Sequence, residues 1–349
     1  MSALKAPFPY YGGKSRFVDE VWSRLGDPTV YVEPFAGSLA VLLRRDAPGQ
    51  REIVCDLNGF IPNFWRALRE DPEAVAYWAD YPTFHHDLTA RHRWLVEWGR
   101  ENAERLSADA DWYDAKAAGW WVWGISSWIG GKWCDDRGDV TNSAPALQAA
   151  PGGRGVSAQR LAILKVSDAI PKVADRVGGQ GVQTQRRQLP GVVGTGERLS
   201  DWFRALAQRL SRVVVLNRDW SSGLTPTLLM HTAQSPKPPV GIFLDPPYKQ
   251  ANRVAVGFYR NDLSDDVAVA SYEWAVEHGA NPQYRIAYCC HEGDFPLPDD
   301  WTVGKGLGFK GIKKPKRRSN RDIIMYSPGC LTPEQEERSV PGEQLILNA

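Results

Sequence analysis

Several features of unusual protein classes are missing from this sequence. No stretch approaches the ~18 consecutive apolar residues that a membrane-spanning helix needs, and the first residues lack the apolar segment of a signal peptide. There are only five cysteines, and none forms a C-x-x-C pair. We therefore expect reduced thiols in a cytoplasmic protein, with no metal site and no membrane partner. The sequence also contains no internal repeat.

Neither sign of charge dominates. The chain has 42 Lys and Arg residues against 41 Asp and Glu residues, which gives a net charge of +1. A protein of this charge can bind nucleic acid only if its positive charge is gathered locally. The length of 349 residues predicts about two domains, with a core large enough to fold without disulfides or a metal.

Tryptophan is the abundant residue type, with 15 in the chain. Many of them lie between residues 94 and 133, in segments with helical periodicity. We interpret this stretch mainly as the core of a helical region, and a wedge that contacts DNA is the alternative. Trp120, Trp121 and Trp123 cannot all face one side of a helix, so at least one must be exposed or buried against another element.

Strand and helix patterns alternate near the start of the chain. Buried strands are predicted at 28–34 and 51–56, each ending in a carboxylate, and helices are predicted at 38–45 and from Ile61 onward. This alternation indicates a parallel α/β sheet. Further strand patterns follow at 212–217, 240–245, 285–290 and 322–326.

The pattern changes between residues 69 and 205. Helical periodicity is followed there by turn-rich stretches, without a repeated strand–helix unit. We therefore expect residues 1–68 and 206–328 to form one domain, residues 69–205 to be inserted into it, and residues 329–349 to be a tail.

The strongest motif is Asp245-Pro246-Pro247-Tyr248, which directly follows an apolar strand. Ligands of open α/β sheets bind at the carboxyl ends of strands. The two prolines fix the backbone and remove two donors, which leaves carbonyls, one carboxylate and one aromatic ring. Such a group can accept hydrogen bonds from an exocyclic amine and stack on a flat base. A proline turn that merely caps the strand is the alternative.

Two other strand ends carry acids in a setting that suits a nucleoside. Glu33-Pro-Phe-Ala-Gly37 forms a strand end and a tight turn, where small residues allow close approach of the backbone. Asp56 ends the next strand and is placed to accept hydrogen bonds from ribose hydroxyls, although an ordinary helix N-cap is the alternative. Gly13-Lys14-Ser15 imitates a phosphate-binding P-loop, but the required earlier glycine is Phe8.

Together these motifs resemble the DNA adenine methylase family, the alpha group of S-adenosylmethionine-dependent N6-adenine DNA methyltransferases. The order of the motifs matches that group: Gly-Gly-Lys, then Glu-Pro-Phe-x-Gly, then the insertion, then Asp-Pro-Pro-Tyr. Asn217-Arg-Asp219-Trp220 resembles the family's Asp-Phe element, and the tryptophan-rich insertion is similar to that of phage-type members. One departure is Leu39, which stands where the family commonly has a second glycine.

The resemblance implies a Rossmann-like class I methyltransferase sheet with helices on both faces and an inserted, mostly helical target-recognition domain. It implies S-adenosyl-L-methionine as cofactor and double-stranded DNA as partner. It implies catalytic roles for Asp245, Pro246, Pro247 and Tyr248. The cofactor-binding positions that it implies are Tyr10, Tyr11, Gly12, Lys14, Glu33, Phe35, Ala36, Gly37, Asp56, Asp219 and Asp245.

Local positive charge suggests where DNA binds. The candidates for DNA contact are a basic run near the end of the chain and a pair of arginines in the insertion. The alternative for the basic run is a solvated hairpin tip. These residues are Arg186, Arg187, Lys313, Lys314, Lys316, Arg317 and Arg318. Two other functions remain open at this point: methylation of cytosine N4 or another amine, and DNA binding by a catalytically inactive member.

Overall fold

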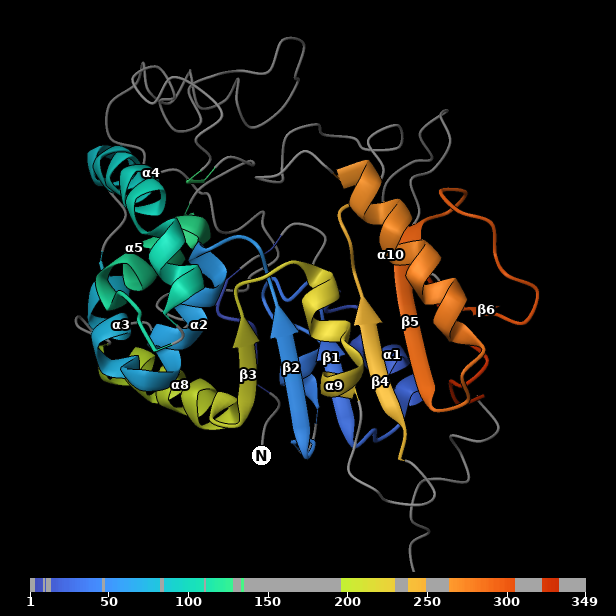
Figure 1. Cartoon of the computed structure of the whole chain (residues 1–349). Coiled ribbons are helices and arrows are strands. Elements are labelled where there is room, and N and C mark those ends of the chain that lie inside the picture. The colour runs from blue at the N-terminus through green and yellow to red at the C-terminus, as the bar shows by residue number, and fades with distance from the viewer. Residues whose placement is uncertain are drawn as a thin grey trace, which may run out of the picture.

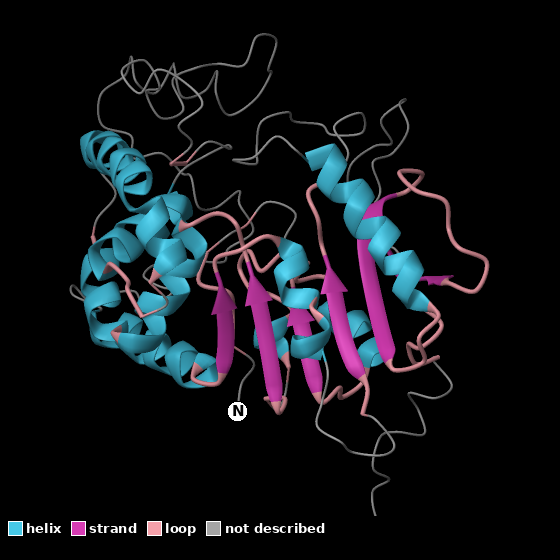
Figure 2. Ribbon diagram, viewed as in Figure 1, coloured by secondary structure: helices cyan, strands magenta, loops and turns pink. Residues whose placement is uncertain are grey.

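The computed structural model describes residues 4–8, 10, 14–45, 48–81, 85–109, 111–127, 133–134, 196–229, 238–248, 264–304 and 322–332. Seven strands form one sheet in the order β3-β2-β1-β4-β5-β7-β6. β1 to β5 are parallel, and β7 runs antiparallel to both β5 and β6, as Figures 1 and 2 show for the central strands. The strands are β1 (Val30–Glu33), β2 (Arg51–Cys55), β3 (Val213–Leu216), β4 (Val240–Leu244), β5 (Tyr284–His291), β6 (Thr302–Val303) and β7 (Asp322–Tyr326).

A hydrophobic cluster covers each face of the sheet. Alternate residues of a strand point to opposite sides, so each buried strand contributes to both clusters. Tyr31 and Val54 belong to a cluster that includes the helices α1 (Val18–Leu25), α2 (Phe60–Glu70) and α8 (Gly196–Leu210). Val30, Val32 and Ile53 belong to the cluster on the other face. That second face is covered by η2 (Trp220–Leu224), α9 (Pro226–Leu229) and α10 (Ser264–Gly279). The predicted α/β fold with helices on both faces is confirmed.

Three helices of the predicted insertion lie beside the β3 edge of the sheet (Figure 1). They are α3 (Pro72–Ala79), α4 (His85–Ala108) and α5 (Ala115–Ser127). α3 and α5 pack against α2 or α8, so the helical region shares one hydrophobic cluster with the sheet. Trp121 and Trp123 are fully buried, as a helical core requires, whereas Trp120 is half-buried. None of the described residues of this stretch joins the sheet, and its division into a separate domain stays a prediction.

The predicted helix at 38–45 is wrong. The structure has only a short 3-10 helix there, η1 (Leu42–Arg44). Leu39 has φ +54°, a left-handed conformation that cannot continue a right-handed helix. The sequence interpretation also missed β6, which has two residues. Among the described residues, no helix is long and apolar enough to cross a membrane.

Candidate active site

The motif residues meet because four parallel strands end at one edge of the sheet. Glu33 is the last residue of β1, Asp56 directly follows β2, and Asp245 directly follows β4. Asp219 lies three residues beyond the end of β3. Parallel strands bring their carboxyl ends to the same edge, which is where ligands bind in open α/β sheets.

Lys14 and Asp245 form the central ion pair of this edge. The Lys14 Nζ lies 2.8 Å from Asp245 Oδ1 and 3.1 Å from Oδ2, so it contacts both carboxylate oxygens. The Lys14 side chain is only 2% exposed, and that of Asp245 is 19% exposed. Lys14 Nζ also lies 4.8 Å from the centre of the Tyr248 ring, in a cation–π contact. Lys14 and the Asp-Pro-Pro-Tyr motif, far apart in sequence, therefore form one cluster.

Burial and charge act against each other on the two partners of this pair. Burial lowers the pKa of the Lys14 ammonium, but the carboxylates of Asp245 and Asp322 outweigh that effect and hold it above its ordinary value. Burial raises the pKa of Asp245, and both Lys14 and a hydrogen bond with Tyr248 oppose that rise. A buried ion pair of this kind is costly to break, because removing one partner leaves an uncompensated buried charge.

The turn after β1 is built closely around Gly37. Gly37 has φ +46°, and a Cβ at this position would lie 2.7 Å from the Cδ1 atom of Tyr10. The Gly37 N–H donates to Asp56 Oδ2 at 3.0 Å, and the Asn58 N–H donates to Oδ1 at 2.8 Å. The Trp65 indole donates to the Gly37 carbonyl at 3.3 Å. Only glycine combines this backbone conformation with this contact.

Asp56 keeps hydrogen-bonding capacity after these contacts. An ionised carboxylate has about four acceptor sites, and the two backbone donors use one on each oxygen. Burial raises the pKa of Asp56 to about 6, while the hydrogen bonds from Asn58 and Gly37 lower it. The carboxylate is therefore mostly ionised at neutral pH and can accept two further hydrogen bonds.

Glu33 is the most deeply buried acid of the site, with 3% exposure. The Tyr31 hydroxyl donates to Glu33 Oε2 at 3.1 Å. Burial raises the pKa of Glu33 to about 8, against the lowering effects of the Tyr31 hydroxyl and of a backbone hydrogen bond from Leu42. Glu33 therefore holds a proton at neutral pH and supports the turn after β1 as a neutral group.

A second aromatic group lies at the ends of β1 and β3. The rings of Phe35 and Trp220 stack, with centroids 6.0 Å apart and planes 20° apart. Asp219 caps η2 through its Oδ1, which accepts from the Ser221 N–H at 3.0 Å and from the Ser221 hydroxyl at 2.6 Å. Ala36 is buried, and its N–H donates to the Cys55 carbonyl at 2.8 Å, which ties the turn to β2.

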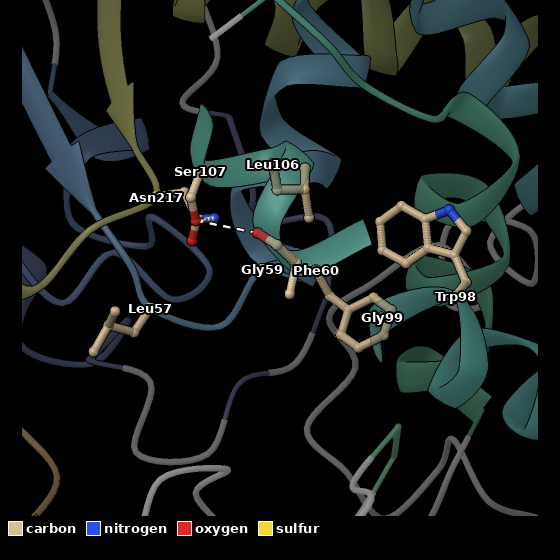
Figure 3. A pocket seen from close by; sticks show the side chains of 9 residues that line it. Leu57, Gly59, Phe60, Trp98, Gly99, Leu106, Ser107 and Asn217 are labelled. Atoms are coloured by element: carbon tan, nitrogen blue, oxygen red, sulfur yellow. Dashed lines mark hydrogen bonds between the residues drawn. The ribbon is translucent and has the colours of Figure 1, made fainter. Parts of the chain in front are cut away.

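A cavity of about 230 Å³ is lined by Leu57 and Asn217, which come just after β2 and β3 (Figure 3). It lies between these strand ends and helix α4. Phe60 and Trp98 supply aromatic rings 5.4 Å apart. Leu57 is 51% exposed, which is unusual for a leucine. The cavity therefore combines aromatic rings with the polar side chains of Ser107 and Asn217.

Two residues of this edge were missed by the sequence interpretation. His291, the last residue of β5, contacts the Tyr248 ring with centroids 4.4 Å apart, and its Nδ1 lies 3.1 Å from Asp322 Oδ1. Burial raises the pKa of Asp322, but His291 and Lys14 outweigh it and bring the pKa below its ordinary value. The only sequence signal for this contact was the pair of strands predicted at 285–290 and 322–326. If these two strands pair antiparallel, the end of the first lies beside the start of the second.

The structure brings together Lys14, Glu33, Asp56, Asp245 and Tyr248, with the residues of the turn after β1. Pro246 is buried and Pro247 is half-buried between Asp245 and Tyr248. The remaining predicted residues lie outside the described residues: Tyr11, Gly12, Arg186, Arg187, Lys313, Lys314, Lys316, Arg317 and Arg318. Among the described residues, no group of three or more His, Cys, Asp or Glu side chains could hold a metal ion.

Comparison with known proteins supports the resemblance drawn from the motifs. Residues 10–93 match the model of a family described as D12 class N6 adenine-specific DNA methyltransferase. The match covers the glycine–lysine segment, the turn after β1 and Asp56, and it ends inside α4. A search of curated proteins found no match. Residues 10–93 are thus similar to an N6 adenine-specific DNA methyltransferase domain, which supports an enzyme of that class.

Proposed function

We propose, on the premise that residues 10–93 carry a D12 class N6 adenine-specific DNA methyltransferase domain, that the chain methylates N6 of an adenine flipped out of duplex DNA. S-adenosyl-L-methionine, when bound, supplies the activated methyl group. The observation that carries this proposal is the cluster of Lys14, Asp245 and Tyr248 directly after β4, at the same sheet edge as Asp56.

The turn after β1 and the end of β2 fit a nucleoside cofactor. Asp56 has two acceptor positions left, which suits the two ribose hydroxyls. Gly37 leaves the space that a Cβ would fill, and the ring of Tyr10 borders it. Exposed Leu57 and the neighbouring cavity suit a flat, largely apolar ring.

Asp245 is the residue we assign to the target amine. The N6 lone pair of adenine is delocalised into the ring, so the amine is a poor nucleophile. Hydrogen bonds from N6 to the Asp245 carboxylate and to the Pro246 carbonyl favour a more tetrahedral nitrogen and fix its direction. Lys14 holds the Asp245 carboxylate in place through contacts to both oxygens. The contribution of the protein is therefore positioning and arranged charge.

Tyr248 is the residue we assign to the flipped base. An amine inside a duplex is inaccessible to such a site, so the base has to leave the stack. An aromatic ring next to the acceptor stacks on any flat base and holds its exocyclic group near Asp245. Tyr248 also lowers the pKa of Asp245, which links the two functions.

DNA binding is assigned to the helical region and to the basic residues outside the described part of the chain. Replacing Lys316, Arg317 and Arg318 with alanine should flatten the slope of log affinity against log salt by about one to three units, since each neutralised phosphate contributes roughly −0.9. Affinity should fall equally for cognate and other sequences. Salt titrations of binding to duplex DNA measure both effects, and an unchanged slope would assign DNA contact elsewhere.

The direct test is Asp245→Asn, which keeps the size of the side chain. We expect loss of methyl transfer by several orders of magnitude, because a misplaced reacting group is costly, while the fold is retained. The assay follows tritium transfer from labelled S-adenosylmethionine to unmethylated duplex DNA, with nucleoside mass spectrometry of the product. Asp71→Ala, which removes the N-cap of α3 far from the site, is the matched control and should keep full activity.

Two results would contradict the proposal. One is wild-type turnover by folded Asp245→Asn protein. The other is N4-methylcytosine as the product, which would favour the cytosine reaction. Absence of any binding heat with S-adenosylmethionine would separately remove the cofactor assignment.

A further inference from the structure

A histidine–carboxylate pair lies directly behind the proposed base-stacking ring. His291 ends β5 and Asp322 begins β7, and the antiparallel register pairs them directly. His291 Nδ1 lies 3.1 Å from Asp322 Oδ1. The backbone N–H of His291 donates to Asp294 Oδ2 at 3.2 Å. Asp322 therefore lies against the imidazole, and Asp294 fixes the backbone that carries it.

The imidazole packs against the ring of Tyr248. The two centroids are 4.4 Å apart and the planes meet at 74°, an edge-to-face arrangement that aromatic rings favour. Tyr248 lies in the loop after β4, the strand that neighbours β5. Lys14 Nζ also contacts this ring, at 4.8 Å from its centre. The ring of Tyr248 is thus oriented by neighbours from different parts of the chain.

The His291 side chain is only 14% exposed, and its contact within the site is Tyr248. A role in the reaction would therefore act through that ring and not through direct contact with DNA. The pair also lies on regular strands, which hold side chains more precisely than loops do.

We propose that His291 is a positioning residue: held by Asp322, it fixes the Tyr248 ring in the orientation on which the target base stacks. This inference rests on the proposed function. It predicts that the rate of methyl transfer depends on the shape of residue 291, whereas binding of S-adenosylmethionine does not.

Two substitutions at residue 291 separate shape from chemistry. His291→Ala removes the ring, and we expect kcat to fall about 10- to 100-fold, the scale expected for a displacement of about 1 Å. His291→Phe keeps an edge-to-face ring, and we expect it to retain most of the activity. Asp322→Asn keeps an acceptor for the imidazole, so we expect a smaller loss than for His291→Ala. The dissociation constant of S-adenosylmethionine, measured by calorimetry, should be unchanged in all three variants.

A double-mutant cycle tests whether His291 acts through Tyr248. In a Tyr248→Ala background, His291→Ala should have little further effect on kcat, because the ring that it orients is gone. His278 supplies the matched control. It stacks on Trp274 with centroids 4.3 Å apart in α10, so His278→Ala removes a similar histidine contact away from the site and should leave kcat unchanged.

The contact itself can be tested without activity. The chain has six histidines, so the imidazole signals are resolvable by NMR, and loss of one signal in His291→Phe identifies His291. Tyr248→Leu should shift that signal by removing the ring current. No shift, an equal effect of His291→Ala in both backgrounds, or full activity of His291→Ala would overturn the inference. If the wild-type protein transfers no methyl group while the NMR shift is present, the proposed function fails and the contact stands.

Discussion

The left-handed backbone at Leu39 leads to a prediction about stability. Leu39 is fully buried in the main hydrophobic cluster and has φ +54°. Leu→Ala in a core typically costs about 2–5 kcal/mol, and glycine loses in addition the buried Cβ, which is worth about 0.8 kcal/mol. The two variants also differ in the backbone term. A left-handed conformation costs roughly 1–2 kcal/mol for a residue with a Cβ and nothing comparable for glycine.

The usual advantage of alanine over glycine is therefore offset at this position. At a position with negative φ, a protein with alanine is more stable than one with glycine by about 0.4–1 kcal/mol, because alanine lowers the conformational entropy of the unfolded chain. At position 39 the relief of strain by glycine opposes both this term and the loss of the Cβ. We expect Leu39→Gly and Leu39→Ala to be equally stable to within about 1 kcal/mol, although both are less stable than the wild type.

Urea unfolding followed by tryptophan fluorescence measures this difference as a shift in midpoint at constant slope. Ala40→Gly is the control, since Ala40 is adjacent and does not have positive φ. This control should lose stability by about 0.4–1 kcal/mol. If Leu39→Ala were more stable than Leu39→Gly by more than about 1 kcal/mol, position 39 would carry no left-handed strain. The same result would also mean that strain at Leu39 does not explain why residues 38–45 do not form a helix.

Three further predictions concern the charged groups of the site. Tyr248→Phe should keep base stacking and most of the activity, but it removes the hydroxyl, which lowers the pKa of Asp245. The acidic limb of the pH–rate profile should therefore move to higher pH, and an unmoved limb would contradict this. The pKa of Asp56 is about 6, so affinity for S-adenosylmethionine should fall as pH drops below 6, and calorimetry with Asp56→Asn should show a weaker but pH-independent affinity over that range. The pKa of Glu33 is raised to about 8, so its contribution to stability is present below its ordinary pKa of 4.5 and is lost as pH rises to 8. In Glu33→Gln this part of the pH dependence of unfolding should disappear, and an unchanged dependence would place the titrating group elsewhere.

The sequence by itself determined the sheet and most of the site. Apolar runs ending in acids at Glu33, Asp56 and Asp245 are local patterns, and a parallel sheet necessarily brings such ends to one edge. The order of the motifs identified the family resemblance, which the match over residues 10–93 confirmed. Helical periodicity indicated that the tryptophan-rich stretch is mainly a core, but not that Trp121 and Trp123 are the buried members.

Only the tertiary structure decided which side chains touch. The pairing of Lys14 with Asp245 joins residues 231 positions apart, and no local pattern specifies such a contact. His291 reaches Tyr248 because β4 and β5 are neighbours, and it reaches Asp322 because β7 is antiparallel to β5. The strand order and register that create these contacts depend on long-range packing. The left-handed backbone at Leu39 could likewise not be predicted from the sequence, because the apolar residues around it suit a helix. The surrounding core holds the backbone in that conformation.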